Sequence, residues 1–273
     1  MSTIKEHLEN GQYFRTWESN KRSVKGVILL VHGLGEHCER YDALAKLCNE
    51  RGYHVGSMDL PCHGRSEGPR GHINSFDTYE EAIVGLYDAL AERYSGLPMA
   101  ILGHSMGGLI TARLLLSHED KFKAAMLSGA AIQSPQEPPV WQVAIIRNLA
   151  KLFPTMKVLQ LDAQGVSRDP EVVARYFADP LVSKEKLSAQ FLVSMFEAME
   201  QVKAQASQLS LPLLIMHGGA DVMTDPKGSE WLYETVGAAE KTLNVYPDLF
   251  HEIFNEPEGP VIIGEMLDWL ESR

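Results

Sequence analysis

Short, nearly continuous apolar runs recur along the chain, and longer segments with a helical spacing of apolar residues lie between them. The longest run, residues 27–31, is typical of a central strand that is covered on both faces. The strands predicted in this way are 12–17, 26–31, 53–58, 99–102, 124–127, 212–216 and 241–246. The helices predicted between them lie near 40–51, 77–94, 107–117, 228–235 and 258–271. This alternation predicts an α/β fold with a mostly parallel sheet flanked by helices.

The alternation stops between about residues 132 and 211, where the pattern is helical or irregular and no strand is predicted. This stretch begins with a proline-rich segment, and a later helix is predicted near 184–208. We expect one overall domain in which residues 1–132 and 211–273 form the core. Residues 133–210 would form an all-helical cap, or lid, inserted between two strands.

Residues 140–153 within the lid are apolar around most of a helical circumference. Such a helix either packs on the core or faces a lipid or substrate. Its few polar positions favour the second interpretation, with Ile145 and Leu149 on the lipid-facing side. The lid is therefore a candidate for transient contact with a membrane surface.

The composition is that of an ordinary globular protein, with 45% hydrophobic and 22% charged residues among 273. This length suits one large α/β domain better than two separate domains. The formal net charge is −11 and no Lys/Arg cluster offers a phosphate-binding stripe, so we expect no nucleic-acid partner. The same charge argues against purely electrostatic docking on anionic lipid, but not against apolar insertion.

Cysteine usage and the absence of long apolar runs predict the compartment. Cys38, Cys48 and Cys62 form neither an even disulfide framework nor a metal-binding spacing, which is typical of a reducing interior. The first ten residues lack the apolar centre of a secretory signal, and no apolar run approaches the roughly 18 residues of a spanning helix. We expect a cytoplasmic protein with, at most, peripheral contact with a membrane.

The most informative motif is Gly103-His104-Ser105-Met106-Gly107, which lies between a predicted strand and a predicted helix. Gly-x-Ser-x-Gly in this setting is typical of a nucleophile elbow, a sharp turn that exposes a serine hydroxyl at the end of a sheet. Glycines suit such a turn because its backbone is strained and leaves little room for side chains. Ser105 is therefore the candidate nucleophile, and the alternative is a serine in an ordinary strand-to-helix turn.

A serine hydroxyl needs a base that takes its proton, and the base needs an acid that orients it. In folds with this elbow the chain order is serine, acid, histidine. His251 follows the last predicted strand and is the candidate base, with a solvated loop histidine as the alternative, whereas His217 comes too early. Asp221 is the first carboxylate after the preceding strand and is the candidate acid. Asp225, followed by Pro226, is more typical of a helix N-cap.

Hydrolysis at a carbonyl also requires two backbone N–H groups that stabilise the oxyanion. Met106, directly after the candidate nucleophile, would supply one. Leu34, in the glycine-rich loop 32–37, is the candidate for the other. The two histidines of this loop, His32 and His37, are a weak metal pair because neither a thiol nor a placed carboxylate accompanies them. No metal and no cofactor is expected.

Together these residues resemble the monoacylglycerol lipases of the α/β-hydrolase superfamily, especially the bacterial and plant members often labelled lysophospholipases. The resemblance runs through nearly the whole chain and includes a Gly-Glu-His loop and, in the lid, a Tyr-x-x-Asp-Pro stretch. The lid helix near 140–153 departs from the animal enzymes. The matching segments are 32–37 with Arg40 and Tyr41, 64–68, 103–108, 176–180, 219–221 and 251–252.

The resemblance implies the α/β-hydrolase fold and a cofactor-free serine hydrolase. Its members would be carboxylic ester hydrolases (acylglycerol lipases) that cleave monoacylglycerol into a free fatty acid and glycerol through an acyl-enzyme. The family's triad falls on Ser105, Asp221 and His251, and its oxyanion donors fall on Leu34 and Met106, as the residues themselves suggest.

The resemblance further implies that Arg40, His104 and Tyr176 recognise the alcohol part of the substrate. Solvation of a helix start would explain Arg40 equally well, and packing of the lid on the core would explain Tyr176. Competing functions are a lysophospholipase or broad carboxylesterase with the same triad, and an acyltransferase that uses another acceptor than water. From a different class, a non-catalytic ligand-binding protein with this fold is a further alternative.

Overall fold

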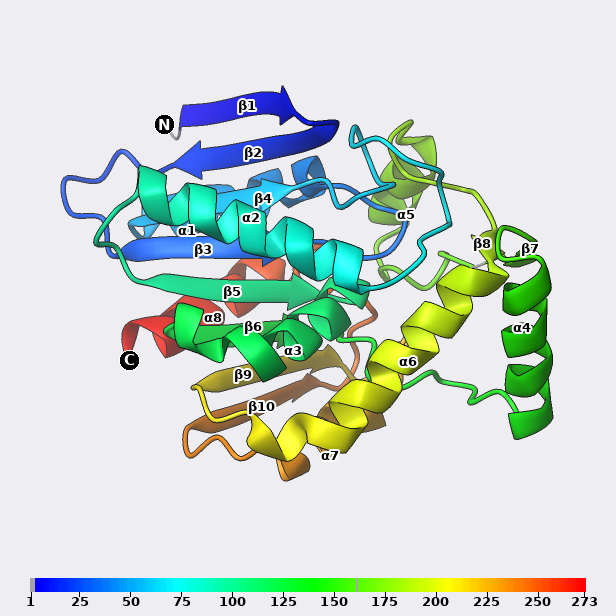
Figure 1. Ribbon diagram of the computed structural model, residues 1–273. Coiled ribbons are helices and arrows are strands. Elements are labelled where there is room, and N and C mark those ends of the chain that lie inside the picture. Colours follow the sequence, from blue (N-terminus) through cyan, green and yellow to red (C-terminus); the bar gives the residue numbers. More distant parts are fainter. Residues whose placement is uncertain (1–2, 161) are drawn as a thin grey trace.

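The seven predicted strands and one further strand, β1, form an eight-stranded sheet in the order β1-β2-β4-β3-β5-β6-β9-β10 (Figure 1). The computed structural model describes residues 3–160 and 162–273. All neighbours from β4 to β10 are parallel, whereas β2 pairs antiparallel with both β1 and β4. The strands are β1 (Thr3–Glu9), β2 (Gln12–Glu18), β3 (Gly26–Val31), β4 (Tyr53–Met58), β5 (Met99–His104), β6 (Ala124–Ser128), β9 (Leu213–Gly218) and β10 (Lys241–Tyr246).

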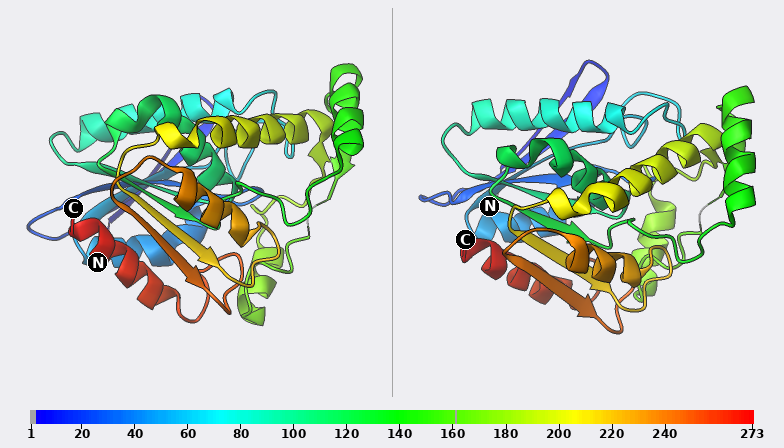
Figure 2. Two further views of the ribbon diagram at one scale, coloured as in Figure 1. Left: turned by 90° about the horizontal axis from the view of Figure 1, so that it is seen from below. Right: turned by 60° about the horizontal axis from the view of Figure 1, so that its bottom comes forward.

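Helices cover both faces of this sheet, as Figure 2 shows from two sides. One face is covered by α1 (Asp42–Glu50) and α8 (Gly259–Glu271). The other face is covered by α2 (Asp77–Arg93), α3 (Met106–His118) and α7 (Pro226–Thr235). Short 3-10 helices are η1 (Cys38–Tyr41), η2 (Glu119–Lys121) and η3 (Ala206–Gln208).

Strand β3 shows why the central runs are continuously apolar. Val27, Leu29 and Val31 pack among residues of α2 and α3. Ile28 and Leu30 pack on the opposite face with α1 and α8. Successive side chains of a strand point to opposite faces, so a strand with helices on both sides buries every position. The prediction of a parallel sheet flanked by helices is confirmed.

The edge strand β1 is the element of the core that the pattern does not predict. All seven of its residues are exposed, and its large apolar side chains are only Ile4 and Leu8. It is held by pairing with β2 rather than by burial. Apolar patterning detects buried elements, so a strand that contributes backbone hydrogen bonds and little core is missed.

The insertion between β6 and β9 lies beyond the carboxyl ends of the parallel strands (Figure 1). The expectation of an all-helical insertion is wrong, because two of its segments pair as a small antiparallel sheet. Strands of three and two residues are too short to leave an alternating pattern. The elements of the insertion are α4 (Val140–Leu152), β7 (Lys157–Leu159), α5 (Pro170–Ala178), β8 (Leu187–Ser188) and α6 (Ala189–Gln205).

Helix α4 packs on α6 along one side and stands away from the sheet (Figure 2). Leu149 and Ala150 face Ala189 and Val193 of α6, so the expectation that Leu149 faces lipid is wrong. Ile145 lies on the other side and is 50% exposed. We define the apolar lid face by the exposed large apolar side chains of residues 140–159, which are Val140, Trp141, Ile145, Leu152, Phe153, Met156 and Leu159.

Candidate active site

Ser105 lies in the turn between β5 and α3, at the carboxyl end of the sheet. Its φ of 55° and ψ of −121° are strained for a residue with a side chain, at a cost of about 1–3 kcal/mol. The flanking glycines make this turn sterically feasible. A Cβ on Gly103 would overlap the Thr111 hydroxyl, and a Cβ on Gly107 would overlap the carbonyl oxygen of Val31. The strand–turn–helix setting expected for the motif is therefore present.

The loops after β9 and β10 bring Asp221 and His251 together, although they are 30 residues apart in the chain. His251 Nδ1 lies 2.6 Å from Asp221 Oδ2. An ionised carboxylate only accepts hydrogen bonds, so Nδ1–H donates and the lone pair remains on Nε2. Burial by itself lowers the pKa of His251, but the hydrogen bond and charge of Asp221 outweigh it and raise the pKa above its usual value. A buried imidazole with a free Nε2 lone pair is suited to accept a proton.

His104 connects this pair to the serine turn. Its ring lies 4.8 Å from that of His251, and it directly precedes Ser105 in the chain. Nδ1 of His104 is 3.3 Å from the Ser128 hydroxyl, and the side chain is buried. Burial, together with the neighbouring His251, lowers the pKa of His104 to about 4. His104 therefore stays neutral beside His251 at neutral pH.

Asp221 is held by more groups than His251 alone. Its Oδ1 accepts from the backbone N–H groups of Met223 and Thr224, at 2.7 and 3.1 Å. Its Oδ2 accepts from the Thr224 hydroxyl at 2.9 Å and from His217 Nε2 at 3.1 Å. Burial opposes ionisation, yet the hydrogen bonds from His217 and His251 hold the pKa of Asp221 well below its usual range. The carboxylate is thus fixed in orientation and stays ionised.

His217 is a residue of the site that the sequence reasoning set aside. It is the penultimate residue of β9, is fully buried, and its Nδ1 lies 2.7 Å from the Ser229 hydroxyl. Its chain position excluded it as the base, but the spacing of four residues to Asp221 was a signal that the two could meet across the turn after β9. Asp225 is the N-cap of α7 and accepts from Lys227 N–H, so its interpretation as a cap is confirmed.

Residues 33–37, which we call the oxyanion loop, pass directly over the serine turn. A Cβ on Gly33 would lie 3.1 Å from Ser105 Cβ. Glu36 Oε1 accepts from Gly33 N–H and from the Tyr41 hydroxyl, both at 2.6 Å. Met106 is the first residue of α3, where a backbone N–H has no acceptor within the helix. Leu34 directly follows Gly33 and Met106 directly follows Ser105, so both predicted donors belong to the two segments that meet at this turn.

Arg40 joins the oxyanion loop to the loop that carries His251. Its guanidinium donates to Glu36, and to both carboxylate oxygens of Glu252 at 2.7 and 2.8 Å. It also stacks on Tyr176 of α5, 4.6 Å from the ring centroid. Burial opposes ionisation of Glu36, but Arg40 lowers the pKa of Glu36 to about 2. Arg40, His104 and Tyr176 therefore lie at the site, with the charge of Arg40 shared by two carboxylates.

Glu36 and Glu252 are two members of this network to which the sequence reasoning gave no role, although both belong to motif segments that it singled out. Glu36 lies in the Gly-Glu-His loop, and Glu252 directly follows the candidate base. Both side chains are buried, at 3% and 5% exposure of the residue. A buried carboxylate needs a partner of opposite charge, and that partner can be identified only from tertiary contacts.

The two histidines considered as a metal pair have separate partners. His32 Nε2 accepts from Leu60 N–H at 2.9 Å, whereas His37 Nε2 lies 2.9 Å from Asp179 Oδ2. In the part of the chain that the structure describes, no group of three or more His, Cys, Asp and Glu side chains could hold a metal ion. No helix among those residues has both the length and the apolar character needed to cross a bilayer.

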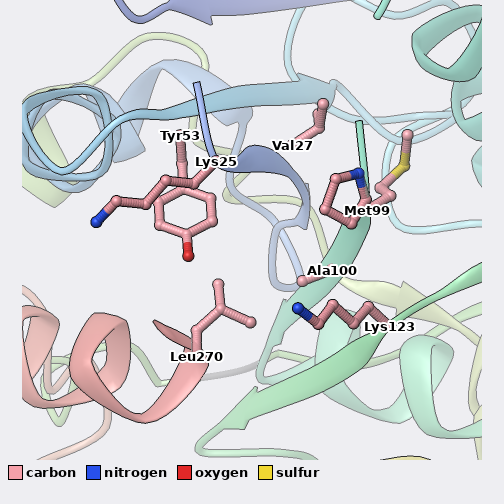
Figure 3. A pocket seen from close by; sticks show the side chains of 8 residues that line it. Lys25, Val27, Tyr53, Met99, Ala100, Lys123 and Leu270 are labelled. Carbon is pink, nitrogen blue, oxygen red and sulfur yellow. The ribbon is translucent and has the colours of Figure 1, made fainter. Parts of the chain in front are cut away.

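A pocket at the other end of the sheet is separate from this site (Figure 3). It lies where β3 and β5 begin, at Val27 and Met99, whereas Ser105 follows the end of β5. Its two lysines have partners: Lys25 pairs with Glu271 at 2.7 Å, and Lys123 donates to the backbone oxygen of Arg273. Lys25 is thus paired with a carboxylate, and the ammonium group of Lys123 is already hydrogen-bonded to the backbone.

The strand order, the helices on both faces and a serine in the turn after β5 define the class: this protein is an α/β-hydrolase. A family model described as "Serine aminopeptidase, S33" matches residues 22–258. The chain is 37% identical to a monoacylglycerol lipase of Mycolicibacterium smegmatis, over 91% of this chain and 89% of that protein. It is 31% identical to the monoglyceride lipase of Mus musculus, over 98% of this chain and 90% of that protein.

A solved structure agrees with these relatives. The monoacylglycerol lipase of Paleococcus ferrophilus superposes with a TM-score of 0.85 at 34% identity, covering 96% of this chain and 98% of that chain. The chain belongs to the monoacylglycerol lipase family of the α/β-hydrolases.

Proposed function

We propose that this protein is a serine hydrolase that cleaves monoacylglycerol into a free fatty acid and glycerol. The observation that carries the proposal is the buried His251–Asp221 pair, 2.6 Å apart, with the His251 ring 4.8 Å from that of His104, which directly precedes Ser105 in its strained turn. This arrangement suits an activated hydroxyl nucleophile. Family membership supplies the substrate class, because the relatives that match over nearly the whole chain are named for this lipid.

In the proposed mechanism, Ser105 Oγ attacks the ester carbonyl carbon while His251 Nε2 accepts the hydroxyl proton. The oxyanion is stabilised by the backbone N–H groups of Leu34 and Met106. The tetrahedral intermediate collapses, the C–O bond to glycerol breaks, and His251 returns the proton to the departing oxygen. Water then attacks the acyl-enzyme with His251 again as base, which releases the fatty acid and restores Ser105.

The electrostatics of the site support this cycle. Asp221 stabilises the imidazolium that forms at His251 in each half-reaction. His104 has its pKa lowered to about 4, so it adds no second positive charge next to the imidazolium. We assign Arg40, His104 and Tyr176 to the side of the site that receives the glycerol part, where Arg40 and Tyr176 would present polar groups from the core and the insertion.

We propose that residues 133–210 act as a lid and that the apolar lid face contacts a lipid surface while the protein itself stays in the cytoplasm. The exposed side chains of this face include Trp141 at 62% and Leu152 at 73% exposure. Apolar patches of this kind on otherwise polar proteins mark partner or membrane contact sites. Such contact would bring the site close to the aggregated lipid that contains its substrate.

A fluorophosphonate probe tests the proposal most directly. The purified protein is labelled with and without a long-chain monoacylglycerol as competitor, and the adduct is mapped by mass spectrometry. We expect labelling at Ser105 that the monoacylglycerol prevents. Labelling at Ser105 that the monoacylglycerol does not prevent would support a serine hydrolase but refute monoacylglycerol as its substrate. Hydrolysis rates for esters with one acyl chain and different head groups would then identify the substrate. Absence of labelling would refute the hypothesis that Ser105 is an activated nucleophile and would favour a ligand-binding protein.

A further inference from the structure

The segment that follows α5 contacts the oxyanion loop at two points. Ser183 N–H donates to the carbonyl oxygen of Gly35 at 2.7 Å. His37 Nε2 lies 2.9 Å from Asp179 Oδ2, although the two residues are 142 positions apart in the chain. Gly35 has a φ of +75°, and a Cβ there would lie 3.4 Å from the Ser183 carbonyl oxygen. The insertion and the oxyanion loop are therefore in close backbone contact.

The backbone of the oxyanion loop is held by hydrogen bonds rather than by the conformational preference of its residues. Leu34 lies between Gly33 and Gly35, and glycine adopts more backbone conformations than any other residue. On the core side, Glu36 of the loop accepts the Gly33 N–H and is itself held by Tyr41 and Arg40. On the outer side, the contacts to Gly35 and His37 come from the insertion. The direction of the Leu34 N–H thus depends on restraints that come from both sides.

The carboxylate of Asp179 is itself fixed in orientation, so its contact with His37 restrains the loop in a defined way. Its Oδ1 accepts from Leu181 N–H at 2.8 Å, across Pro180, so the carboxylate is turned with Oδ2 toward His37. His37 is only 2% exposed. Because the carboxylate accepts, His37 Nε2–H is the donor, and a hydrogen bond to an ionised acceptor is about twice as strong as a neutral one.

The same part of the insertion also contacts the loop that carries His251. Glu252 N–H donates to the carbonyl oxygen of Val166 at 2.8 Å. Glu256, whose side chain is fully buried, accepts from Arg168 N–H at 3.0 Å and from Phe250 N–H at 3.1 Å. Residues 166–183 thus touch both loops of the site, whereas α4 packs on α6 and exposes most of its surface.

We infer that Asp179, through His37, is a positioning residue for the oxyanion loop. Residues 166–183 then belong to the catalytic scaffold, and this narrows the lid proposed above for residues 133–210 to the part around α4, which alone would face lipid. The inference rests on the proposed function. It predicts that disrupting this contact slows the chemical step on every ester, including small soluble ones. Changes confined to the apolar lid face would affect only aggregated substrates.

The test compares Asp179→Ala and Asp179→Asn with the wild type on p-nitrophenyl butyrate and on emulsified 1-oleoylglycerol. Glu171→Gln is the matched control, because Glu171 lies on α5, the helix that ends directly before Asp179, and its side chain is 84% exposed. For Asp179→Ala we expect kcat to fall about 10- to 100-fold on both substrates with KM within about threefold, since small misplacement of catalytic groups costs up to about 10²-fold. Affinity for a trifluoromethyl ketone, whose adduct carries an oxyanion, should fall by the same factor.

Asp179→Asn should be intermediate, with a loss of about three- to tenfold, because the amide retains a neutral hydrogen bond to His37. This variant preserves the packing, so it decides the question if the alanine variant does not fold. Wild-type kcat and ketone affinity in a folded Asp179 variant would overturn the inference, as would a rise in KM alone, which marks a substrate contact. If the wild type itself is not labelled at Ser105 by a fluorophosphonate, the proposed function fails, and the inference fails with it.

Discussion

Replacing Asp221 with asparagine tests the proposed mechanism through the hydrogen bonds of a single side chain. The carboxylate Oδ1 accepts two backbone N–H groups, from Met223 and Thr224, which an amide nitrogen cannot do. The oxygen of the asparagine must therefore take the Oδ1 position. Its NH2 group then replaces Oδ2 and faces His251 Nδ1 and His217 Nε2, which lie 2.6 and 3.1 Å from the present oxygen.

Both histidines can adapt to this change by shifting their tautomer. His217 would accept from the amide and donate from Nδ1 to the Ser229 hydroxyl, which lies 2.7 Å away. His251 would likewise accept through Nδ1, so its proton moves to Nε2 and the lone pair that should take the Ser105 proton is lost. We therefore expect a folded protein, destabilised by about 1–2 kcal/mol, because no buried polar group is left without a partner. The expected loss in kcat is about 10⁴-fold, or about 5.5 kcal/mol of transition-state stabilisation, as for the same change in serine proteases.

The assay is the steady-state hydrolysis of a soluble p-nitrophenyl ester, with thermal unfolding as the measure of folding. Asp225→Asn is the matched control, because Asp225 is the next carboxylate of the same loop and caps α7. Asparagine caps helices as well as aspartate does, so this variant should keep its activity and stability. A folded Asp221→Asn protein with a kcat within tenfold of the wild type would refute Asp221 as the acid that orients His251. Loss of activity in Asp225→Asn would instead indicate that Asp225 is that acid.

The remaining predictions concern the nucleophile, the base, the second histidine on the acid, and the lid. Ser105→Ala should fold but lose at least about 10⁴-fold in kcat, and retained turnover of a soluble ester would exclude Ser105 as nucleophile. The raised pKa of His251 keeps the base protonated to higher pH, so kcat/KM should decline toward acid with a midpoint above about 6.5; a midpoint below about 6 would contradict this. His217→Leu removes a hydrogen-bond donor to Asp221 and should lower kcat about tenfold. His217→Gln keeps an N–H donor and should recover most of the wild-type kcat. Equal losses in the two variants would argue for a packing role of His217. Replacing Trp141 and Ile145, which are 62% and 50% exposed, with serine should slow hydrolysis of emulsified monoacylglycerol several-fold and leave soluble esters unaffected; an equal loss on both substrates would indicate damage to the fold.

Burial explains which elements were predictable. Strands β3, β5 and β9 are buried at every position, so each leaves a continuous apolar run with turn residues at its ends. Strand β1 is exposed throughout, and β7 and β8 have three and two residues, so none of them leaves a periodic signal. The prediction for Leu149 was wrong because α4 is apolar around most of its circumference, and such a pattern does not indicate which side of the helix its neighbour α6 covers.

The sequence by itself determined the layered α/β architecture and the set of residues at the centre of the candidate site. Apolar periodicity is a local property, and Gly-x-Ser-x-Gly between a strand and a helix constrains the backbone at Ser105 within a few positions. The chain order of strands then sufficed to select Asp221 and His251, since residues that end parallel strands meet at one edge of the sheet.

Only the tertiary structure decided what holds these residues in place. The hydrogen bond from His217 to Asp221, the sharing of Arg40 between Glu36 and Glu252, and the contact between His37 and Asp179 join segments that no local pattern connects. These groups are polar and buried or partly buried, so the energy of each depends on whether a partner is within hydrogen-bond distance. That distance is set by how strands, loops and the insertion pack against one another, and it is therefore absent from any single stretch of sequence.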